Sequence, residues 1–195
     1  MRRIPVVPTI VVAIAVAAMI ALGLWQLLDR APKKEAYLAQ LAANPAKPPI
    51  AFPAIADDRL LFRKTSGTCR PPIALRLAGA GAAGFRVIAT CAGTAGMIVQ
   101  LGTTPDPAYK ATWAGGPVRG FISHAPDARS LIGSLFDHSP QNLMLVADTP
   151  LPGLGANGTP DLSSVPNNHL SYAVQWFFFA AIAAVIYVLA VRRRR

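Results

Sequence analysis

The chain has 195 residues, a mean hydropathy of +0.39 and a formal net charge of +10. Six of its 19 basic residues flank the apolar ends of the chain, at Arg2, Arg3 and residues 192–195, which leaves 13 basic against 9 acidic residues between them. No basic stripe interleaved with aromatic residues remains there, so the composition argues against a nucleic-acid-binding protein. The length suits two membrane helices and one domain of modest size.

An uncharged apolar run over residues 4–28 opens the chain. A helix of about 20 residues crosses the hydrocarbon core of a bilayer, at a rise of about 1.5 Å per residue. The run is longer than the apolar region of about 7–15 residues in a secretory signal peptide, and no clear cleavage site follows it. We therefore predict a retained transmembrane helix over residues 4–28, with a cleaved signal peptide as the alternative.

The middle of the chain, residues 29–169, is predicted to form one domain. Ala31-Pro32 predicts a break after the first run, residues 33–43 have the composition of a short helix, and four prolines between residues 45 and 53 indicate an extended linker. Short apolar or alternating runs between Gly- and Pro-rich turns then predict strands at residues 60–64, 73–77, 85–91, 97–101, 118–124 and 142–148. The expected fold is an α+β membrane protein, with two transmembrane helices flanking a mainly antiparallel β domain.

A second uncharged run over residues 170–191 predicts the other transmembrane helix, and a basic tail at residues 192–195 follows it. Lys and Arg near membrane helices favour the cytoplasmic side, so the tail predicts a cytoplasmic C-terminus. The basic residues directly after the first run oppose this orientation, but long domains translocate largely regardless of charge. We predict a multi-pass protein of a bacterial inner membrane, with both termini cytoplasmic and the middle domain in the periplasm.

Two cysteines, Cys69 and Cys91, lie 22 positions apart in that middle domain. In an oxidising compartment such a pair is expected to form a disulfide. Two buried thiols are the alternative, because free cysteine is among the most buried residue types.

His169 stands directly before the second apolar run, after two asparagines. Helical steps of three and four residues put His169, Tyr172 and Trp176 on one face. The imidazole is either a ligand at the bilayer surface or an interfacial polar residue near a helix start, where aromatic residues are common.

Two stretches resemble the Surfeit-locus family of cytochrome oxidase assembly factors. One is Asn-Asn-His-Leu-x-Tyr-Ala-x-x-Trp-Phe at residues 167–177, and the other is Gly-Leu-Trp-Gln at residues 23–26. The resemblance implies two membrane helices around an extracytoplasmic domain, support for heme a insertion, and a heme contact at His169. The Arg-Gly-Trp-Val-Pro stretch of the family has its nearest counterpart in residues 100–105, which keep only the glycine and the final proline.

On this resemblance we predict an assembly factor for a heme-copper (cytochrome c) terminal oxidase that carries heme a transiently. His169 is the predicted ligand of the heme iron, Tyr172 and Trp176 line the ring, and Arg30 meets a propionate. The predicted partners are oxidase subunits, other oxidase assembly factors and the lipid bilayer. The alternative is a membrane-anchored scaffold that binds oxidase subunits without carrying heme.

Two further classes have less support. A copper-handling factor needs soft ligands gathered together, and the middle domain offers only Cys69, Cys91, Met97 and Met144. An enzyme is not predicted, because the sequence has no phosphate loop, dinucleotide fingerprint or zinc-protease helix. The remaining histidines, His124 and His138, are interpreted as solvated loop residues.

Overall fold

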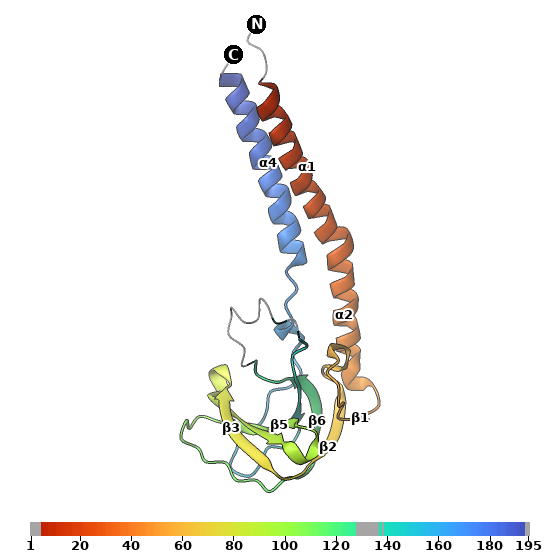
Figure 1. The fold of residues 1–195 in the computed structure, drawn as a ribbon, viewed down its shortest axis with the longest axis vertical. Helices are drawn as coiled ribbons and strands as arrows, with labels where there is room; N and C mark the ends of the chain where they lie inside the picture. Colours follow the sequence, from red (N-terminus) through yellow and green to blue (C-terminus); the bar gives the residue numbers. More distant parts are fainter. Residues whose placement is uncertain (1–4, 128–136, 138, 194–195) are drawn as a thin grey trace. The chain divides into compact units, whose positions relative to one another are not determined.

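The computed structural model describes residues 5–127, 137 and 139–193, and it divides into two compact units (Figure 1). One unit combines Met1–Leu38 with Ser163–Arg195, and the other is Ala39–Leu162. The fold class is confirmed as α+β, because two long apolar helices come from the ends of the chain and a β-sheet lies between them in sequence.

The first unit is built on two antiparallel helices, α1 (Val6–Trp25) and α4 (His169–Arg193), which lie side by side (Figure 1). Both belong to helical stretches that are long and apolar enough to cross a membrane. Only 6% of the most apolar window of each stretch is buried, which differs from the mostly buried core helix of a soluble protein. These two helices are therefore candidate membrane spans.

The contact between α1 and α4 follows a coiled-coil spacing. On α1 the less exposed positions recur in alternating steps of four and three, through Thr9, Val12, Val16, Met19, Gly23 and on to Gln26. On α4 the buried positions are Ala173 and Ala180, seven residues apart. A Cβ atom at Gly23 would lie only 2.7 Å from the ring of Phe177. Small residues thus let the two backbones approach closely, as is common for membrane helices.

The predicted break at Ala31-Pro32 is wrong. A π-helical turn, η1 (Gln26–Arg30), follows α1, and α2 (Ala31–Ala43) continues from it without interruption. The N–H of Ala31 bonds to the carbonyl of Gln26, five residues earlier. A proline inside a helix crowds the carbonyl four residues before it, and the wider π-turn directly ahead of Pro32 relieves that crowding.

The second unit begins with the end of α2. Leu41 is fully buried there, and the side-chain amide of Asn44 in η2 (Asn44–Ala46) donates to the carbonyls of Arg59 and Leu61, both at 2.8 Å. These bonds fix the chain before it enters the sheet.

The described residues of this unit form a seven-stranded mixed sheet in the order β1-β2-β6-β7-β5-β4-β3. Most neighbours are antiparallel, as predicted, but the β1–β2 and β5–β7 pairs are parallel. The strands are β1 (Ile50–Ala51), β2 (Lys64–Cys69), β3 (Ile73–Gly79), β4 (Phe85–Cys91), β5 (Met97–Thr104), β6 (Gly116–His124) and β7 (Leu143–Ala147).

The strand predicted over residues 60–64 is wrong. A 3-10 turn, η3 (Asp58–Leu60), occupies its start, and the side chain of Asp57 accepts a hydrogen bond from the N–H of Arg59 to cap it. The strand β2 begins only at Lys64. The apolar pair Leu60-Leu61 had suggested a strand here. The cap by Asp57 instead favours a helical turn at this place.

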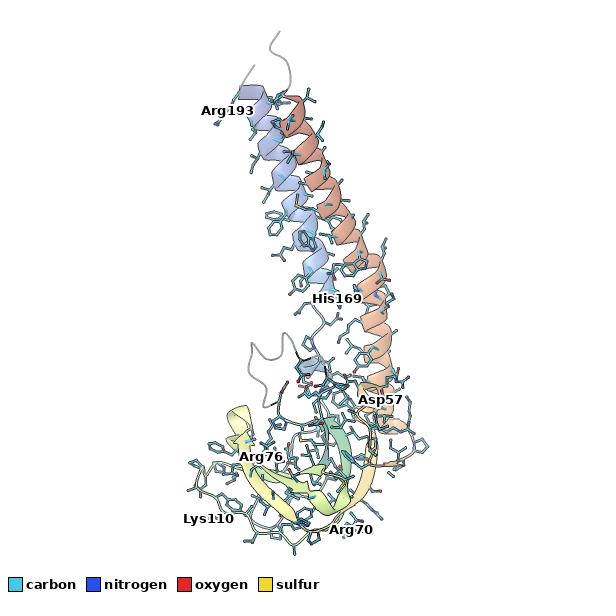
Figure 2. All side chains as sticks on the ribbon, in the orientation of Figure 1. Asp57, Arg70, Arg76, Lys110, His169 and Arg193 are labelled. Carbon is cyan, nitrogen blue, oxygen red and sulfur yellow. A yellow bond between two sulfur atoms is a disulfide. The ribbon has the colours of Figure 1, made fainter. Side chains whose placement is uncertain are left out.

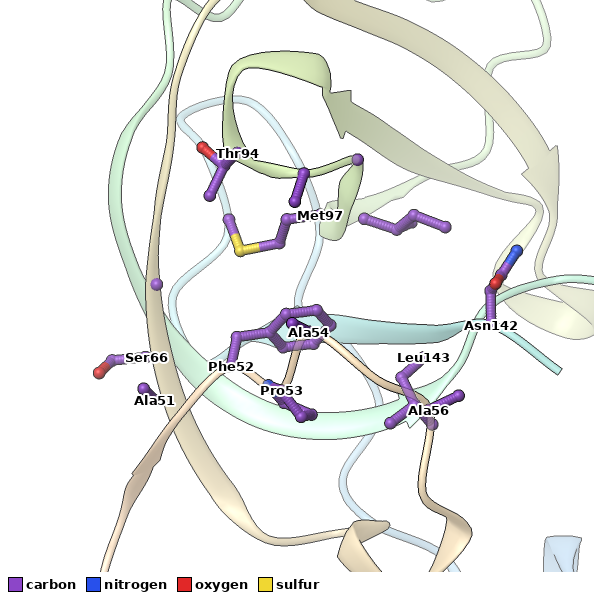
Figure 3. A pocket seen from close by; sticks show the side chains of 14 residues that line it. Ala51, Phe52, Pro53, Ala54, Ala56, Ser66, Thr94, Met97, Asn142 and Leu143 are labelled. Atoms are coloured by element: carbon purple, nitrogen blue, oxygen red, sulfur yellow. The ribbon is translucent and has the colours of Figure 1, made fainter. Parts of the chain in front are cut away.

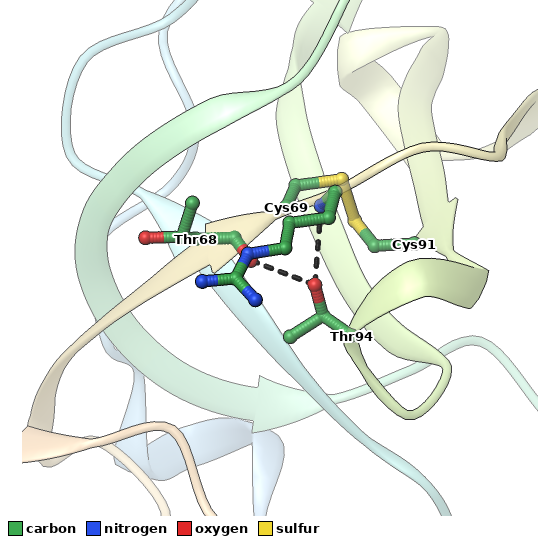
Figure 4. The surroundings of a disulfide bond; sticks show 5 residues. Thr68, Cys69, Cys91 and Thr94 are labelled. Carbon is green, nitrogen blue, oxygen red and sulfur yellow. Dashed lines mark hydrogen bonds between the residues drawn. A yellow bond between two sulfur atoms is a disulfide. The ribbon is translucent and has the colours of Figure 1, made fainter.

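The sheet is strongly curled, and a Cys69–Cys91 disulfide joins two of its strands, β2 and β4 (Figure 4). Three strands separate β2 from β4 in the sheet order, so a flat sheet would hold them about 19 Å apart at about 4.8 Å per strand spacing. The Cα atoms of Cys69 and Cys91 are only 5.3 Å apart. The ends of β2 and β4 thus meet, and the sheet encloses a core between them.

Among the described residues of this unit, two clusters of buried apolar side chains are found. The first contains both cysteines and Met97 together with Val87, Ala89, Val99, Leu101 and Leu145, and the second contains Phe121, Ala125, Met144 and Val146. All five residues of β7 are buried. Because successive side chains of a strand point to opposite faces, β7 contributes to both clusters and is the central strand of the core.

Residues 100–105, the counterpart of the Arg-Gly-Trp-Val-Pro stretch, lie mainly within β5 rather than in a loop. The side-chain amide of Gln100 donates to Asn157 Oδ1 at 2.7 Å, and Asn157 donates to the carbonyl of Ala147 at 2.8 Å. A Cβ atom at Gly102 would lie 2.6 Å from Leu154. In this chain the stretch holds the segment after β7 against the sheet, which is a structural role.

Candidate functional site

His169 is the first residue of α4 (Figure 2). Its imidazole contacts η1, the turn that follows α1. The N–H of Tyr172 donates to the carbonyl of Asn168 at 3.0 Å. His169 therefore lies within the first hydrogen-bonded turn of the helix. The imidazole Nδ1 lies 2.8 Å from Gln26 Oε1 in η1. His169 is half-buried by this contact.

Gln26 is the residue that sequence reasoning missed. It ends the Gly-Leu-Trp-Gln stretch, and His169 belongs to the other stretch that resembles the family, so the structure brings the two stretches together. The spacing of the chain does place Gln26 on the face of the helix that packs against α4, because Gln26 continues the steps of three and four residues from Thr9 to Gly23. A polar residue at such a position needs a partner on the facing helix.

The two predicted ring-lining residues follow His169 on α4, but the structure gives them different surroundings. Tyr172 is 49% exposed. Trp176 is half-buried and packs edge-to-face on Phe179, with ring centroids 6.3 Å apart and an interplanar angle of 87°. Neither ring has a described contact with the imidazole. Their place beside a heme stays a prediction.

The predicted propionate partner, Arg30, lies over the ring of Trp25, with its guanidinium carbon 4.6 Å from the ring centroid. This is a cation–π contact within the same helical stretch. The next two basic residues also have partners in the same continuous helical stretch: Lys33 of α2 pairs with Asp29 of η1 at 2.5 Å, and Lys34 lies 5.1 Å from the centroid of Tyr37. The structure does not bring Arg30 to His169, so its predicted role stays a prediction.

The other histidines do not build a site in the described part of the chain. His124 Nε2 lies 2.9 Å from Asp58 Oδ1 in a partly exposed pair, and His138 lies outside the described residues. The soft ligands considered for a copper site are not gathered together. Both cysteines are in the disulfide, and Met97 and Met144 belong to different clusters. Among the described residues no three His, Cys, Asp or Glu side chains gather as a metal site.

A pocket of about 340 Å³ opens in the second unit, beside the chain that leaves β1 (Figure 3). Phe52, Met97 and Leu143 supply its large apolar walls, and Ser66, Thr94 and Asn142 are its polar side chains. None of its lining residues is titratable, so this pocket offers apolar contact but no acid, base or strong metal ligand.

A comparison with known protein families supports the resemblance carried by residues 23–26 and 167–177, the two stretches that lie together at His169. The sequence model of the SURF1 family matches residues 13–181, which include the later part of α1, the first half of α4 and the whole sheet. A search of curated proteins found no match. The match covers well over half of the chain, and it shows that this protein belongs to the SURF1 family, a family of assembly factors for cytochrome oxidase.

Proposed function

We propose that this protein assists the binding or insertion of heme a during assembly of a heme-copper (cytochrome c) terminal oxidase. The observation that carries the proposal is the position of His169, at the end of the paired helices α1 and α4 and in contact with Gln26. Its partners in this role are oxidase subunits or other oxidase assembly factors.

The chemistry of this helix end suits the proposed cargo. Heme a is flat and apolar and carries two propionates, so it favours a site at the boundary between lipid and water. A neutral imidazole is a common axial ligand of heme iron. Tyr172 and Trp176 offer aromatic surface on the same helix, and Arg30 offers a cation to a propionate. Because the cargo must be passed on, a modest affinity is expected.

The proposed membrane arrangement places residues 4–28 and 170–191 in a bacterial inner membrane. Residues 29–169 are then periplasmic and residues 192–195 form a cytoplasmic tail, of which 194 and 195 lie outside the described residues, as does residue 4. A reporter that is active only in the periplasm should work when fused at Ala156 and fail when fused after Arg195. The opposite pattern of reporter activity would show that the protein has the opposite orientation in the membrane.

The heme role is tested by replacing His169 with alanine in cells that make heme a. The variant should insert normally, because the helix keeps its apolar length, while co-purifying heme and the yield of active oxidase fall. His124→Ala is the control and should behave like the parent, since its imidazole pairs with Asp58 in the other unit. Full heme content and full oxidase activity in the His169 variant would instead support a scaffold that never carries heme.

A further inference from the structure

We infer that Gln26 is a positioning residue that holds His169 as the Nδ1–H tautomer and thereby presents Nε2 to iron. The inference rests on the proposed function, since it assigns how the same imidazole is prepared for heme. It gives a role to Gln26, the last residue of the Gly-Leu-Trp-Gln stretch, to which the sequence had assigned none.

The hydrogen bond between Gln26 and His169 has a defined direction. The amide oxygen of Gln26 can only accept, so the proton in the 2.8 Å contact belongs to His169 Nδ1. In a neutral imidazole the other nitrogen, Nε2, then carries the free lone pair. Among the described residues none bonds to Nε2, so this lone pair is available to a ligand.

Close packing of the two helices restricts the contact between Gln26 and His169. Gln26 lies one turn after Gly23, where the ring of Phe177 comes close to the α1 backbone, and Ala173 is buried one turn after His169. A close approach of the two helices, at Gly23, thus lies one turn along the chain from Gln26. A ring at this position is less free to turn than one on an isolated helix end.

The hydrogen bond to Gln26 should strengthen iron binding by His169. A histidine that binds a metal usually donates its other N–H to a carbonyl or carboxylate, which orients the ring and makes the ligating nitrogen more basic. Loss of such a partner typically costs about 10–100-fold in metal affinity. Replacing Gln26 should therefore weaken heme binding without removing the ligand itself.

The chain offers a matched control for this substitution. Methionine has nearly the shape of glutamine but lacks the amide acceptor, so Gln26→Met removes the hydrogen bond with little change in volume. Gln175→Met makes the same exchange on α4 at an exposed position that has no described hydrogen bond. Gln26→Glu keeps an acceptor at position 26 and strengthens it.

The experiment uses the full-length protein in lipid nanodiscs and follows hemin binding by the Soret absorbance. We expect Gln26→Met to bind hemin about tenfold more weakly than the parent, and Gln175→Met to match the parent. We expect Gln26→Glu to retain the affinity and to lower the midpoint potential of the bound iron, because a more basic imidazole favours the ferric state.

A second readout needs no heme. The chain has three histidines, so ¹⁵N spectra of histidine-labelled protein are simple, and His169→Ala identifies the signals of His169. The parent should show a protonated Nδ1 and an unprotonated Nε2, and Gln26→Met should show a mixture of tautomers. A protonated Nε2 in the parent, or unchanged spectra in Gln26→Met, would overturn the inference.

The outcomes separate the two proposals. If His169→Ala loses hemin while Gln26→Met binds as tightly as the parent, Gln26 is not a positioning residue and the heme role stands. If His169→Ala binds hemin as the parent does, both the heme role and the inference fail.

Discussion

The hydroxyl of Tyr187 on α4 is hydrogen-bonded to the hydroxyl of Thr9 on α1, at the end of the helix pair opposite His169. The Thr9 hydroxyl donates to the carbonyl of Pro5 at 2.7 Å, so Tyr187 is the donor of the interhelical bond. The two helices are thus linked by a polar contact at each end, and by close apolar packing at Gly23 in between.

We expect Tyr187→Phe to weaken the pairing of α1 and α4, because the Thr9 oxygen loses its donor in an apolar environment. Interhelical hydrogen bonds in membranes contribute about 0.6 kcal/mol on average and up to about 2 kcal/mol. Reversible unfolding of the full-length protein in bicelles would measure the change. Tyr172→Phe is the control, since that side chain is half exposed and has no described hydrogen bond. Equal stability of the two variants would show that the Tyr187 bond contributes nothing.

Gly23→Leu should separate the two helices. Its Cβ alone would lie 2.7 to 3.0 Å from the ring atoms of Phe177, which is closer than side chains tolerate. Overpacking of this kind costs about 1–3 kcal/mol. Ala21→Leu, at an exposed position of the same helix, should have little effect. Adding Phe177→Ala should restore the stability of Gly23→Leu, and failure of this rescue in the same unfolding assay would contradict the proposed clash.

The Cys69–Cys91 disulfide should stabilise the second unit by about 3 kcal/mol, which the chain-entropy model gives for a loop of this size. The double variant Cys69→Ala, Cys91→Ala removes the bond but keeps small apolar side chains in the core. Its thermal midpoint should lie below that of the oxidised parent, as should that of the reduced parent. Protein taken from the membrane without reductant should resist thiol alkylation. Two alkylated cysteines in that sample would rule out the bond in cells.

Asp57 should give the second unit a small stabilisation that depends on pH. The pKa of its carboxyl lies below the ordinary value of 3.8, because the Arg59 side chain and then the Arg59 N–H donate hydrogen bonds to it. A lowered folded pKa means that the stabilisation is complete above the unfolded pKa and is lost as the pH falls through the folded one. Asp57→Asn should therefore lower the thermal midpoint at pH 7 but not well below pH 3.8.

The pair is exposed to solvent, so the effect of Asp57→Asn is small and should shrink with added salt. In an Arg59→Gln background the same substitution should lose most of its pH dependence. A difference between parent and Asp57→Asn that stays constant from pH 7 to pH 2 would exclude this account.

The sequence predicts the elements whose own residues are strongly patterned. β4 has the predicted bounds, Phe85–Cys91, and the helix predicted from residue 33 ends at Ala43, as α2 does. β2 was missed because Lys-Thr-Ser-Gly-Thr-Cys has no apolar alternation. Pairing with β6 and the burial of Cys69 set its position, and these are properties of the fold rather than of the segment.

In the candidate site, too, some features follow from a segment's own residues and others only from the fold. His169 could be singled out from its place before an apolar run, but its partner depends on how α1 and α4 are rotated about their axes. The small residues Gly23 and Ala173 set that rotation through packing, which a single helix pattern does not contain. The cation–π contact of Arg30 depends in the same way on the π-turn, which the sequence did not predict.

The order of the chain gives the disulfide a consequence for biosynthesis. Cys69 and Cys91 both precede β5, β6 and β7, the three strands that come to lie between β2 and β4 in the finished sheet. During synthesis both thiols therefore emerge before those strands exist. If the domain is exported as proposed, the bond can close while the later half of the sheet is still being made. The last three strands would then complete the sheet against a covalently closed template, and early oxidation would guide the register of the strands that follow.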